Sequence, residues 1–282
     1  MSYNLLKGKK GLIFGALNES SIAWQTAVRA HEEGAEFILS NAPVASRLGD
    51  VERLAKMCNT EVIYADATNL DDLEMLIKCT MEKMGGKIDF VLHSIGMSPN
   101  VRKNIPYDEI NYDNYLKTLD VSALSLHKIL QLCRKYDAIN EWGSVVALSY
   151  IASTRTLFGY NDMADAKAAL ESIVRSFGYI YGREKKIRIN SISQSPTKTT
   201  AGSGIKGFDR LLDFSERMSP LGNASAAECA DYTITLFSDL SRKVTMQNLM
   251  HDGGFSSIGM SEEAMIQYDK SFDECDCDKQ EK

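Results

Sequence analysis

The sequence predicts an α/β fold, with one doubly wound domain built around a mainly parallel sheet of seven strands. Short apolar runs alternate with longer amphipathic segments, which is the pattern of parallel strands joined by helices. The apolar runs lack strict alternation, as expected of strands that are covered on both faces. The 282 residues include only 5 prolines, and no linker or repeat interrupts them, so we expect one Rossmann-like domain.

Each strand is placed at one of these apolar runs, and each helix at the amphipathic segment that follows it. The strands are expected at Gly11–Phe14, Phe37–Ser40, Glu61–Tyr64, Phe90–His93, Val145–Leu148, Arg188–Ser191 and Asn248–His251. The helices are expected near 21–33, 47–58, 70–84, 112–136, 160–181, 206–217 and 225–238.

Composition narrows the class of protein. The net charge of −6 and the absence of a Lys or Arg run argue against nucleic acid as a partner. No run approaches the ~20 apolar residues of a membrane span, and the first residues lack a secretory apolar region. The six scattered cysteines are typical of a reduced, cytoplasmic chain. Cys275 and Cys277 lack the further ligands of a zinc site, so we expect no metal. The acidic tail, residues 261–282, is expected to be partly disordered.

Ligands bind at the carboxyl ends of parallel strands, so the residues after each strand are the candidate site. Gly15 can form a tight turn beside a phosphate, and Ser21 is a natural N-cap for the next helix. The usual glycine fingerprint is absent, so this loop is equally consistent with an ordinary turn. After the third strand, Asp66-Ala67 could bind adenine. After the fourth, Ser94-Ile-Gly96 could lie against ribose and nicotinamide, whereas His93 is expected to be structural.

A tyrosine and a lysine are the residues that indicate a catalytic site. Tyr160 and Lys167 are seven residues apart, so both face the same way if one helix carries them. We expect the ammonium to lower the phenol pKa from about 10. The spacing alone also suits two solvated residues on an amphipathic helix. The preceding apolar run, Ser144–Ser149, favours the functional interpretation.

Together these motifs resemble the bacterial enoyl-acyl carrier protein reductases, which are divergent short-chain dehydrogenases/reductases. The resemblance covers residues 5 to 260, with the forms from Bacteroidetes-type bacteria most similar, so we expect residues 1–260 to be the reductase domain. It rests on Gly15-x5-Ser21-Ile-Ala, Asp66-Ala67, His93-Ser-Ile-Gly96, Leu148-Ser-Tyr150, Tyr160-x6-Lys167 and Ser195-Pro196. A ketoreductase would have a serine where this chain has Ala147, a loop richer in glycine, and no tyrosine at position 150.

The resemblance implies a mechanism. A reduced nicotinamide gives hydride to the β-carbon of a trans-2-enoyl thioester, and Tyr160 stabilises the enolate oxygen. Lys167 binds the nicotinamide ribose, and Tyr150 assists positioning or proton delivery. The full cofactor set is Gly15, Ser21, Ile22, Ala42, Asp66, Ala67, Ser94, Ile95, Gly96, Lys167, Thr197, Lys198, Thr199, Thr200 and Ala201. The substrate set is Met97, Ser98, Tyr150, Tyr160 and Met163.

Three departures from the family pattern bear on the cofactor. Gln25 replaces a frequent glycine, and Gln194-Ser-Pro-Thr197 makes the nicotinamide edge more polar. Ala42 stands where some NADH-using relatives have Gln. No Lys or Arg precedes Arg47 to meet a 2′-phosphate, which favours NADH and leaves NADPH open.

The family also implies partners. We expect an enoyl substrate linked to acyl carrier protein, docked on Lys198, Lys206 and Arg210, and a homotetramer. Asp209 departs from a third basic position, and the three cations could equally be solvated surface charges. Two other functions stay open: a carbonyl-reducing member of the superfamily, and a non-catalytic nucleotide sensor. A sensor would usually lack the tyrosine or the lysine.

Overall fold

The computed structural model describes residues 2–203 and 207–280. They form a seven-stranded sheet in the order β3-β2-β1-β4-β5-β6-β7, and each neighbouring pair recorded in this part of the chain runs parallel. The predicted fold class is confirmed. The strands are β1 Lys10–Phe14, β2 Glu36–Asn41, β3 Glu61–Tyr64, β4 Ile88–His93, β5 Ile139–Ser149, β6 Arg188–Gln194 and β7 Asn248–His251.

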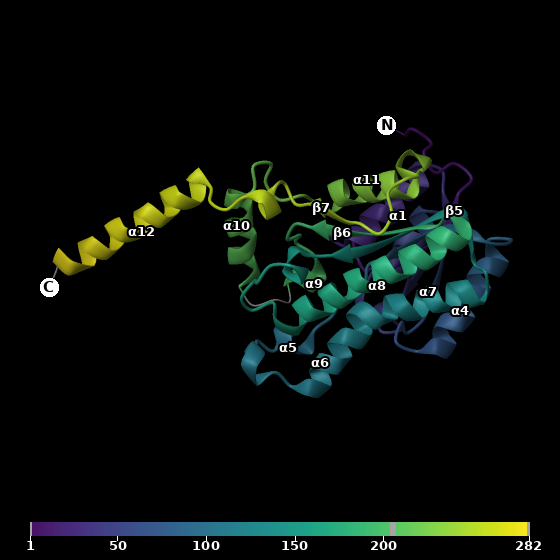
Figure 1. Cartoon of the computed structure of the whole chain (residues 1–282), viewed down its shortest axis with the longest axis horizontal. Helices are drawn as coiled ribbons and strands as arrows, with labels where there is room; N and C mark the ends of the chain where they lie inside the picture. Colours follow the sequence, from purple (N-terminus) through teal and green to yellow (C-terminus); the bar gives the residue numbers. More distant parts are fainter. Residues whose placement is uncertain (1, 204–206, 281–282) are drawn as a thin grey trace.

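Helices cover both faces of the sheet. In Figure 1, α1 (Ile22–Glu32) and α11 (Ala226–Phe237) lie on one face, and α4 (Leu70–Lys83), α7 (Ser125–Lys135) and α8 (Asn161–Lys185) lie on the other. Successive strand residues therefore enter different cores: Leu12 packs with the second group of helices and Ile13 with the first. This double burial explains why the strands lack a polar face.

The shorter helices surround the sheet ends. They are α2 Ala45–Leu48, α3 Val51–Met57, α5 Pro99–Arg102, α6 Tyr112–Leu119, α9 Thr200–Ser203 and α10 Phe208–Met218. In Figure 1, α5, α6, α9 and α10 gather around the first turns of α8.

Two predicted helices differ from the structure. The helix expected near 47–58 is two helices, because Gly49 is extended and a Cβ on it would lie 2.5 Å from the Leu17 carbonyl oxygen. The helix expected near 112–136 contains a π turn at Asp120–Leu124. That wide turn brings Ser122 Oγ to the backbone of Met97, where it accepts from the amide at 3.0 Å and donates to the carbonyl at 3.2 Å. Wide turns of this kind are frequent beside functional sites.

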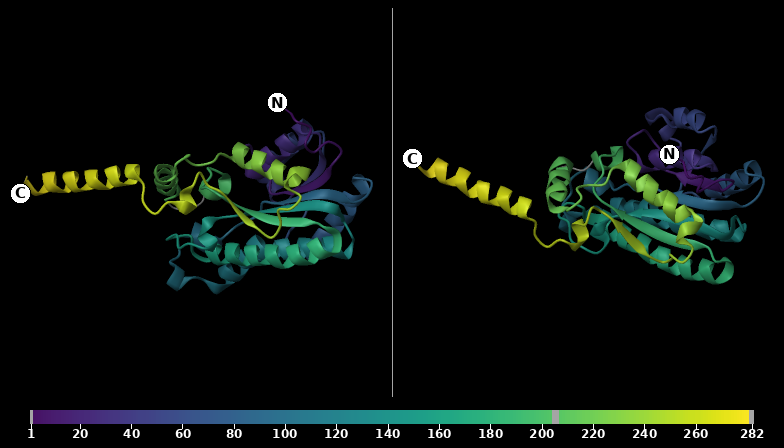
Figure 2. Two further views of the ribbon diagram at one scale, coloured as in Figure 1. Left: turned by 45° about the horizontal axis from the view of Figure 1, so that its top comes forward. Right: turned by 90° about the horizontal axis from the view of Figure 1, so that it is seen from above.

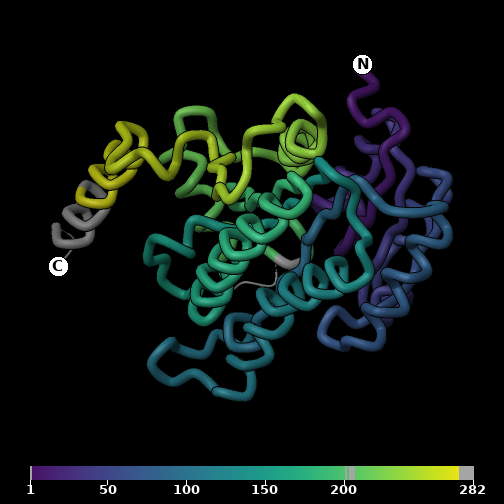
Figure 3. The backbone as a smooth tube through the Cα atoms, turned by 45° about the vertical axis from the view of Figure 1, so that its right-hand side comes forward, coloured from purple at the N-terminus to yellow at the C-terminus, as the bar shows by residue number. Residues whose placement is uncertain are grey.

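Residues Glu262–Gln280 of the acidic tail form α12, and the expected partial disorder of the tail stays a prediction. Figure 2 shows α12 projecting from the body, and in Figure 3 it lies across the molecule from the purple N-terminal segment. Ser261 Oγ attaches its start to α10 by donating to the Arg217 carbonyl at 2.7 Å. The division of the chain at residue 260 stays a prediction. In the described part of the chain, no helix combines the length and apolarity needed to cross a membrane.

Candidate active site

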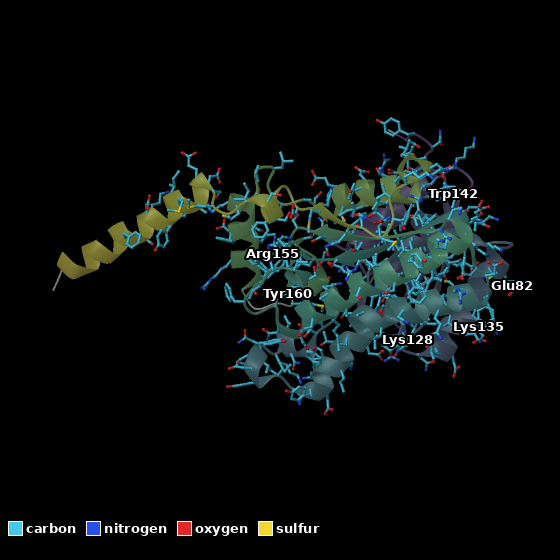
Figure 4. The ribbon with its side chains drawn as sticks, in the orientation of Figure 1. Glu82, Lys128, Lys135, Trp142, Arg155 and Tyr160 are labelled. Atoms are coloured by element: carbon cyan, nitrogen blue, oxygen red, sulfur yellow. The ribbon has the colours of Figure 1, made fainter. Side chains whose placement is uncertain are left out.

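The predicted residues gather at the carboxyl end of the sheet. Tyr150 directly follows β5, and Ser195 directly follows β6. Figure 4 shows Tyr160 and Arg155 at this end of the molecule, and Trp142, Lys135 and Glu82 at the other. Tyr160 therefore lies where ligands of parallel α/β sheets bind.

Tyr150 and Tyr160 lie side by side, with ring centroids 5.0 Å apart and planes tilted by 50°. Tyr160 occupies the N-cap position of α8 rather than its first turn, so the expectation that one helix carries Tyr160 and Lys167 is wrong. Asn161, the first residue of α8, has a φ of 44°. Its side-chain amide donates to the Ile105 carbonyl, which holds this unusual backbone in place.

The expected direction of the Tyr160 pKa is also wrong. Burial raises the pKa of the Tyr160 phenol above its ordinary value. Burial, with smaller contributions from Tyr160 and Asp252, raises the pKa of Tyr150 in the same way. The Tyr150 hydroxyl is buried and has no hydrogen-bond partner among the described residues. Both phenols are therefore neutral donors near neutral pH, and the Tyr150 hydroxyl is available to a ligand.

Lys167 is almost fully buried on α8. Its Nζ donates to the Leu148 carbonyl at 2.8 Å, so it binds the end of β5 just before Tyr150. Burial lowers the pKa of Lys167 to about 8, and the carboxylate of Glu171 opposes this shift. A Cβ placed on Gly96 would lie 3.7 Å from Lys167 Nζ and 3.9 Å from Met163 Cε. The structure thus brings these three predicted residues together.

The β1–α1 loop approaches β4 closely. Gly15 has a φ of 93°, and a Cβ on it would lie 1.9 Å from the Ser94 carbonyl oxygen, so this position requires glycine. Ser21 is at the N-cap position of α1 but makes no side-chain cap bond. Instead its Oγ accepts from the amides of Leu17 and Asn18, both at 3.1 Å. The expected capping role is wrong, because the hydroxyl orders the loop.

The region predicted to bind adenine is ordered by local turns. Asp66 Oδ1 accepts from the amide and hydroxyl of Thr68. At the end of β2, Asn41 Oδ1 accepts from the Ala42 amide at 2.8 Å, and Asn41 Nδ2 donates to the Ala16 carbonyl at 2.7 Å. Ile95 and Ala67 pack against the core of the α4–α7–α8 face. Ile22 is buried against the opposite core.

The segment after β6 reaches back to the first loop. Thr200 Oγ1 accepts from Asn18 Nδ2 at 2.8 Å, which places the 197–201 segment beside the β1–α1 loop. Gln194 is buried, and its Nε2 donates to Thr197 Oγ1 and to the Ala224 carbonyl, both at 3.2 Å. Thr199 Oγ1 accepts from the Gly202 amide, and Lys198 is exposed. Ala201 lies in α9, and its side chain, like all of Lys206, is outside the described residues.

The side chain of Ser98, expected to line the acyl pocket, is hydrogen-bonded to other groups of the protein. Its buried hydroxyl donates to Asp162 Oδ1 at 2.6 Å and accepts from the Val101 amide at 3.0 Å. Asp162 and a second buried carboxylate, Glu171, were both missed from the sequence. Acidic residues in a helix are usually solvated, so only their neighbours reveal them. His93 is structural as expected: it pairs with Ser125 Oγ at 2.8 Å, and burial lowers its pKa to about 3.

A parallel sheet of this strand order, with a Tyr-x6-Lys pair beside the end of β5, defines a short-chain dehydrogenase/reductase. Residues 15–256 match the family model described as enoyl-(acyl carrier protein) reductase. An NADH-type enoyl-acyl carrier protein reductase of Rhizobium meliloti is 35% identical over 91% of this chain and 93% of its own. The chain therefore belongs to the enoyl-acyl carrier protein reductases, as its motifs predicted.

Solved structures agree. The FabI–NADH complex from Alistipes finegoldii is 70% identical, covers 93% of each chain and has a TM-score of 0.92. The NADH-type reductase of Aquifex aeolicus is 31% identical, covers 91% of this chain and 99% of its own, and has a TM-score of 0.84. The resemblance to Bacteroidetes-type forms is confirmed by the first of these.

Proposed function

We propose that the chain reduces trans-2-enoyl thioesters on acyl carrier protein, with NADH as reductant, in fatty-acid elongation. Family membership supports this activity, and the relative from A. finegoldii is named as an NADH complex. The observation that carries it is the pair of adjacent phenols, Tyr150 and Tyr160, beside a strand end that Lys167 holds.

The residues fit NADH. Gly15 leaves the first loop without a side chain at its closest approach to Ser94, so backbone amides can face a phosphate. Asn41 ends β2 and Ala42 follows it, and both side chains are neutral. The Asn41 side chain accepts from the Ala42 backbone amide and donates to the Ala16 carbonyl. A 2′-phosphate requires a cation at this place. The structure therefore supports NADH rather than NADPH.

The chain's own residues orient the reaction. When bound, NADH supplies the hydride that reaches the β-carbon of the enoyl thioester. Tyr160 donates a hydrogen bond to the thioester oxygen, where negative charge develops. The raised pKa keeps this phenol protonated, so it acts as a neutral donor rather than as phenolate. Lys167 would hold the ribose hydroxyls of the bound cofactor, and Tyr150 would offer its hydroxyl, which has no partner among the described residues, to the substrate.

The activity is tested by following NADH absorbance with two substrates. We expect oxidation of NADH with crotonyl thioester and little with acetoacetyl thioester. Faster turnover of the acetoacetyl thioester would make the chain a carbonyl reductase. NADH binding without turnover of either thioester would make it a sensor.

The carrier protein is acidic, so its docking needs a local cationic patch. Lys198 and Arg210 are exposed on the segments next to the site, which supports docking there. We expect Arg210→Glu to raise KM for the carrier-linked substrate at low salt, with a much smaller effect on the CoA-linked one. An equal effect on both would place docking elsewhere. Assembly as a cytoplasmic homotetramer is part of the same proposal, and sedimentation velocity measures its oligomeric state.

A further inference from the structure

We propose that Glu171 is a positioning residue, whose buried carboxylate fixes the end of β5 and the start of β7 against α8 and keeps Lys167 cationic for the cofactor. The inference rests on the proposed function, since it concerns how Lys167 is prepared to bind NADH.

Glu171 joins three elements from inside the protein. Its side chain is nearly fully buried. Its Oε1 accepts from Ser149 Oγ at 2.6 Å, at the end of β5, and from Asn248 Nδ2 at 2.9 Å, at the start of β7. Asn248 Oδ1 in turn accepts from Ser191 Oγ in β6 at 3.0 Å. A buried carboxylate is stable only when such donors surround it.

The same strand end is held by Lys167. Lys167 precedes Glu171 by four residues, so the two share a face of α8. Lys167 bonds the carbonyl of Leu148, and Glu171 bonds the side chain of the next residue, Ser149. Tyr150 follows directly. The lysine, the carboxylate and the substrate-side tyrosine are therefore linked through three consecutive residues of β5 and its end.

Electrostatics gives the carboxylate its second role. Burial lowers the pKa of Lys167 to about 8, and among the described residues Glu171 is the charge that opposes this loss. Three other titratable groups at the site are neutral near neutral pH. His93 on β4 has a pKa of about 3, and the phenols of Tyr160 and Tyr150 have raised pKa values. Asp252, after β7, acts on Tyr150.

The test is the pH dependence of NADH affinity, measured by fluorescence titration of the whole protein. In the wild type, affinity should fall above about pH 8, where Lys167 loses its proton. Glu171→Gln removes a negative neighbour, so the lysine pKa should fall further. We expect the alkaline fall to move toward acid by about one pH unit. Near pH 8 this is about fivefold weaker binding.

Three further variants distinguish an electrostatic effect of Glu171 on Lys167 from a purely structural role of its hydrogen bonds. Glu184→Gln makes the same change on an exposed part of α8, where Glu184 pairs with Arg134, and should leave the profile unchanged. Ser149→Ala removes one hydrogen bond but keeps the charge, so it should lower Tm without moving the alkaline fall. Glu171→Asp should shift the fall in the same direction by less, and it serves if the amide variant does not fold.

A Glu171→Gln profile parallel to that of the wild type would overturn the proposal, because a purely structural role weakens binding equally at every pH. So would an equal shift in the Glu184→Gln control. The readout is binding, without an enoyl substrate. If the wild type binds NADH but leaves crotonyl thioester unreduced, the proposed function fails while the Glu171 result still stands.

Discussion

Two buried carboxylates lie on α8 on either side of Lys167, and they have different neighbours. Asp162, near the start of the helix, accepts from the neutral side chains of Ser98, Asn100 and Thr118 at 2.6, 2.8 and 2.9 Å. These donors belong to the α5–α6 side of the site. Glu171 instead accepts from two strand ends and acts on the charge of a lysine.

The difference shows that two carboxylates nine residues apart on one helix have different roles, which their neighbours determine. Asp162 has only neutral donors, so it anchors the segment that flanks the substrate. Glu171 accepts from neutral donors and also opposes the lowering of the Lys167 pKa, so it both holds the strands in place and affects the charge of the lysine. We therefore expect changes at Asp162 to alter stability, and changes around Glu171 to alter cofactor binding.

The largest effect is expected for Asp162→Ala. It removes the recorded acceptor of the buried Ser98 hydroxyl and one of two acceptors of Asn100 and Thr118, which keep the carbonyls of Asn111 and Asn114. Each lost bond to a charged acceptor costs about 1–3 kcal/mol. Allowing for relaxation, the free energy of unfolding should fall by about 3–5 kcal/mol, as measured by urea denaturation. Asp165→Ala is the control, since Asp165 accepts from the exposed Tyr107 hydroxyl and should lose about 1 kcal/mol or less. Equal losses would remove the anchoring role.

Tyr160→Phe tests the phenol just before α8, the helix that carries both carboxylates. Loss of one oxyanion donor should lower kcat by roughly 10- to 1,000-fold, which is about 1.4–4 kcal/mol. NADH affinity and stability should barely change. Steady-state kinetics measure the effect, and turnover within twofold of the wild type would show that Tyr160 does not contact the enolate.

Lys167→Ala removes the cation that distinguishes the Glu171 region. The lost ribose contacts should cost about 2–3 kcal/mol, which is about 30- to 150-fold in Kd for NADH. Fluorescence titration measures this change. Adding Glu171→Gln in this background should leave the pH profile flat, because no ammonium remains to titrate. Unaltered affinity in the single variant would refute the ribose role.

The smallest effect is expected for Asp162→Asn. The amide keeps one acceptor oxygen of similar shape, so the unfolding free energy should fall by only about 1–2 kcal/mol. The alkaline fall in NADH affinity should stay where it is in the wild type, in contrast to Glu171→Gln. A shift of that fall would show that the two carboxylates are electrostatically equivalent.

Much of the fold could be predicted because it depends on local pattern. Apolar runs such as Phe90–His93 and Val145–Leu148 predict central strands, because only strands covered on both faces lack a polar side. Gly15 could be predicted as well, since a tight turn after β1 needs a residue without a side chain. The helix breaks at Gly49 and at the π turn could not, because each depends on a loop distant in sequence.

The sequence predicted residues that the structure brings close together, but it did not predict their local geometry. Tyr160 lies outside the helix because Asn161 bonds the carbonyl of Ile105, 56 residues earlier. Glu171 is buried because Asn248, 77 residues later, donates to it. The pKa of Tyr160 is decided by burial rather than by its spacing from Lys167. Sequence separation hides all three effects, since each arises only when the strand ends meet.

Because of the π turn at Asp120–Leu124, the structure between α6 and α7 depends more on the number of residues there than on which side chains they carry. Each helical residue turns the helix by about 100°. A π turn holds one residue more than a regular α-helical turn, so deletion of one residue here would restore regular helix. Leu126, Ile129 and Leu130, all fully buried, would stay in the core, and Ser122 would be withdrawn from Met97. Related chains that differ in length are expected to keep this turn and to absorb insertions elsewhere, such as in the 103–111 connection before α6.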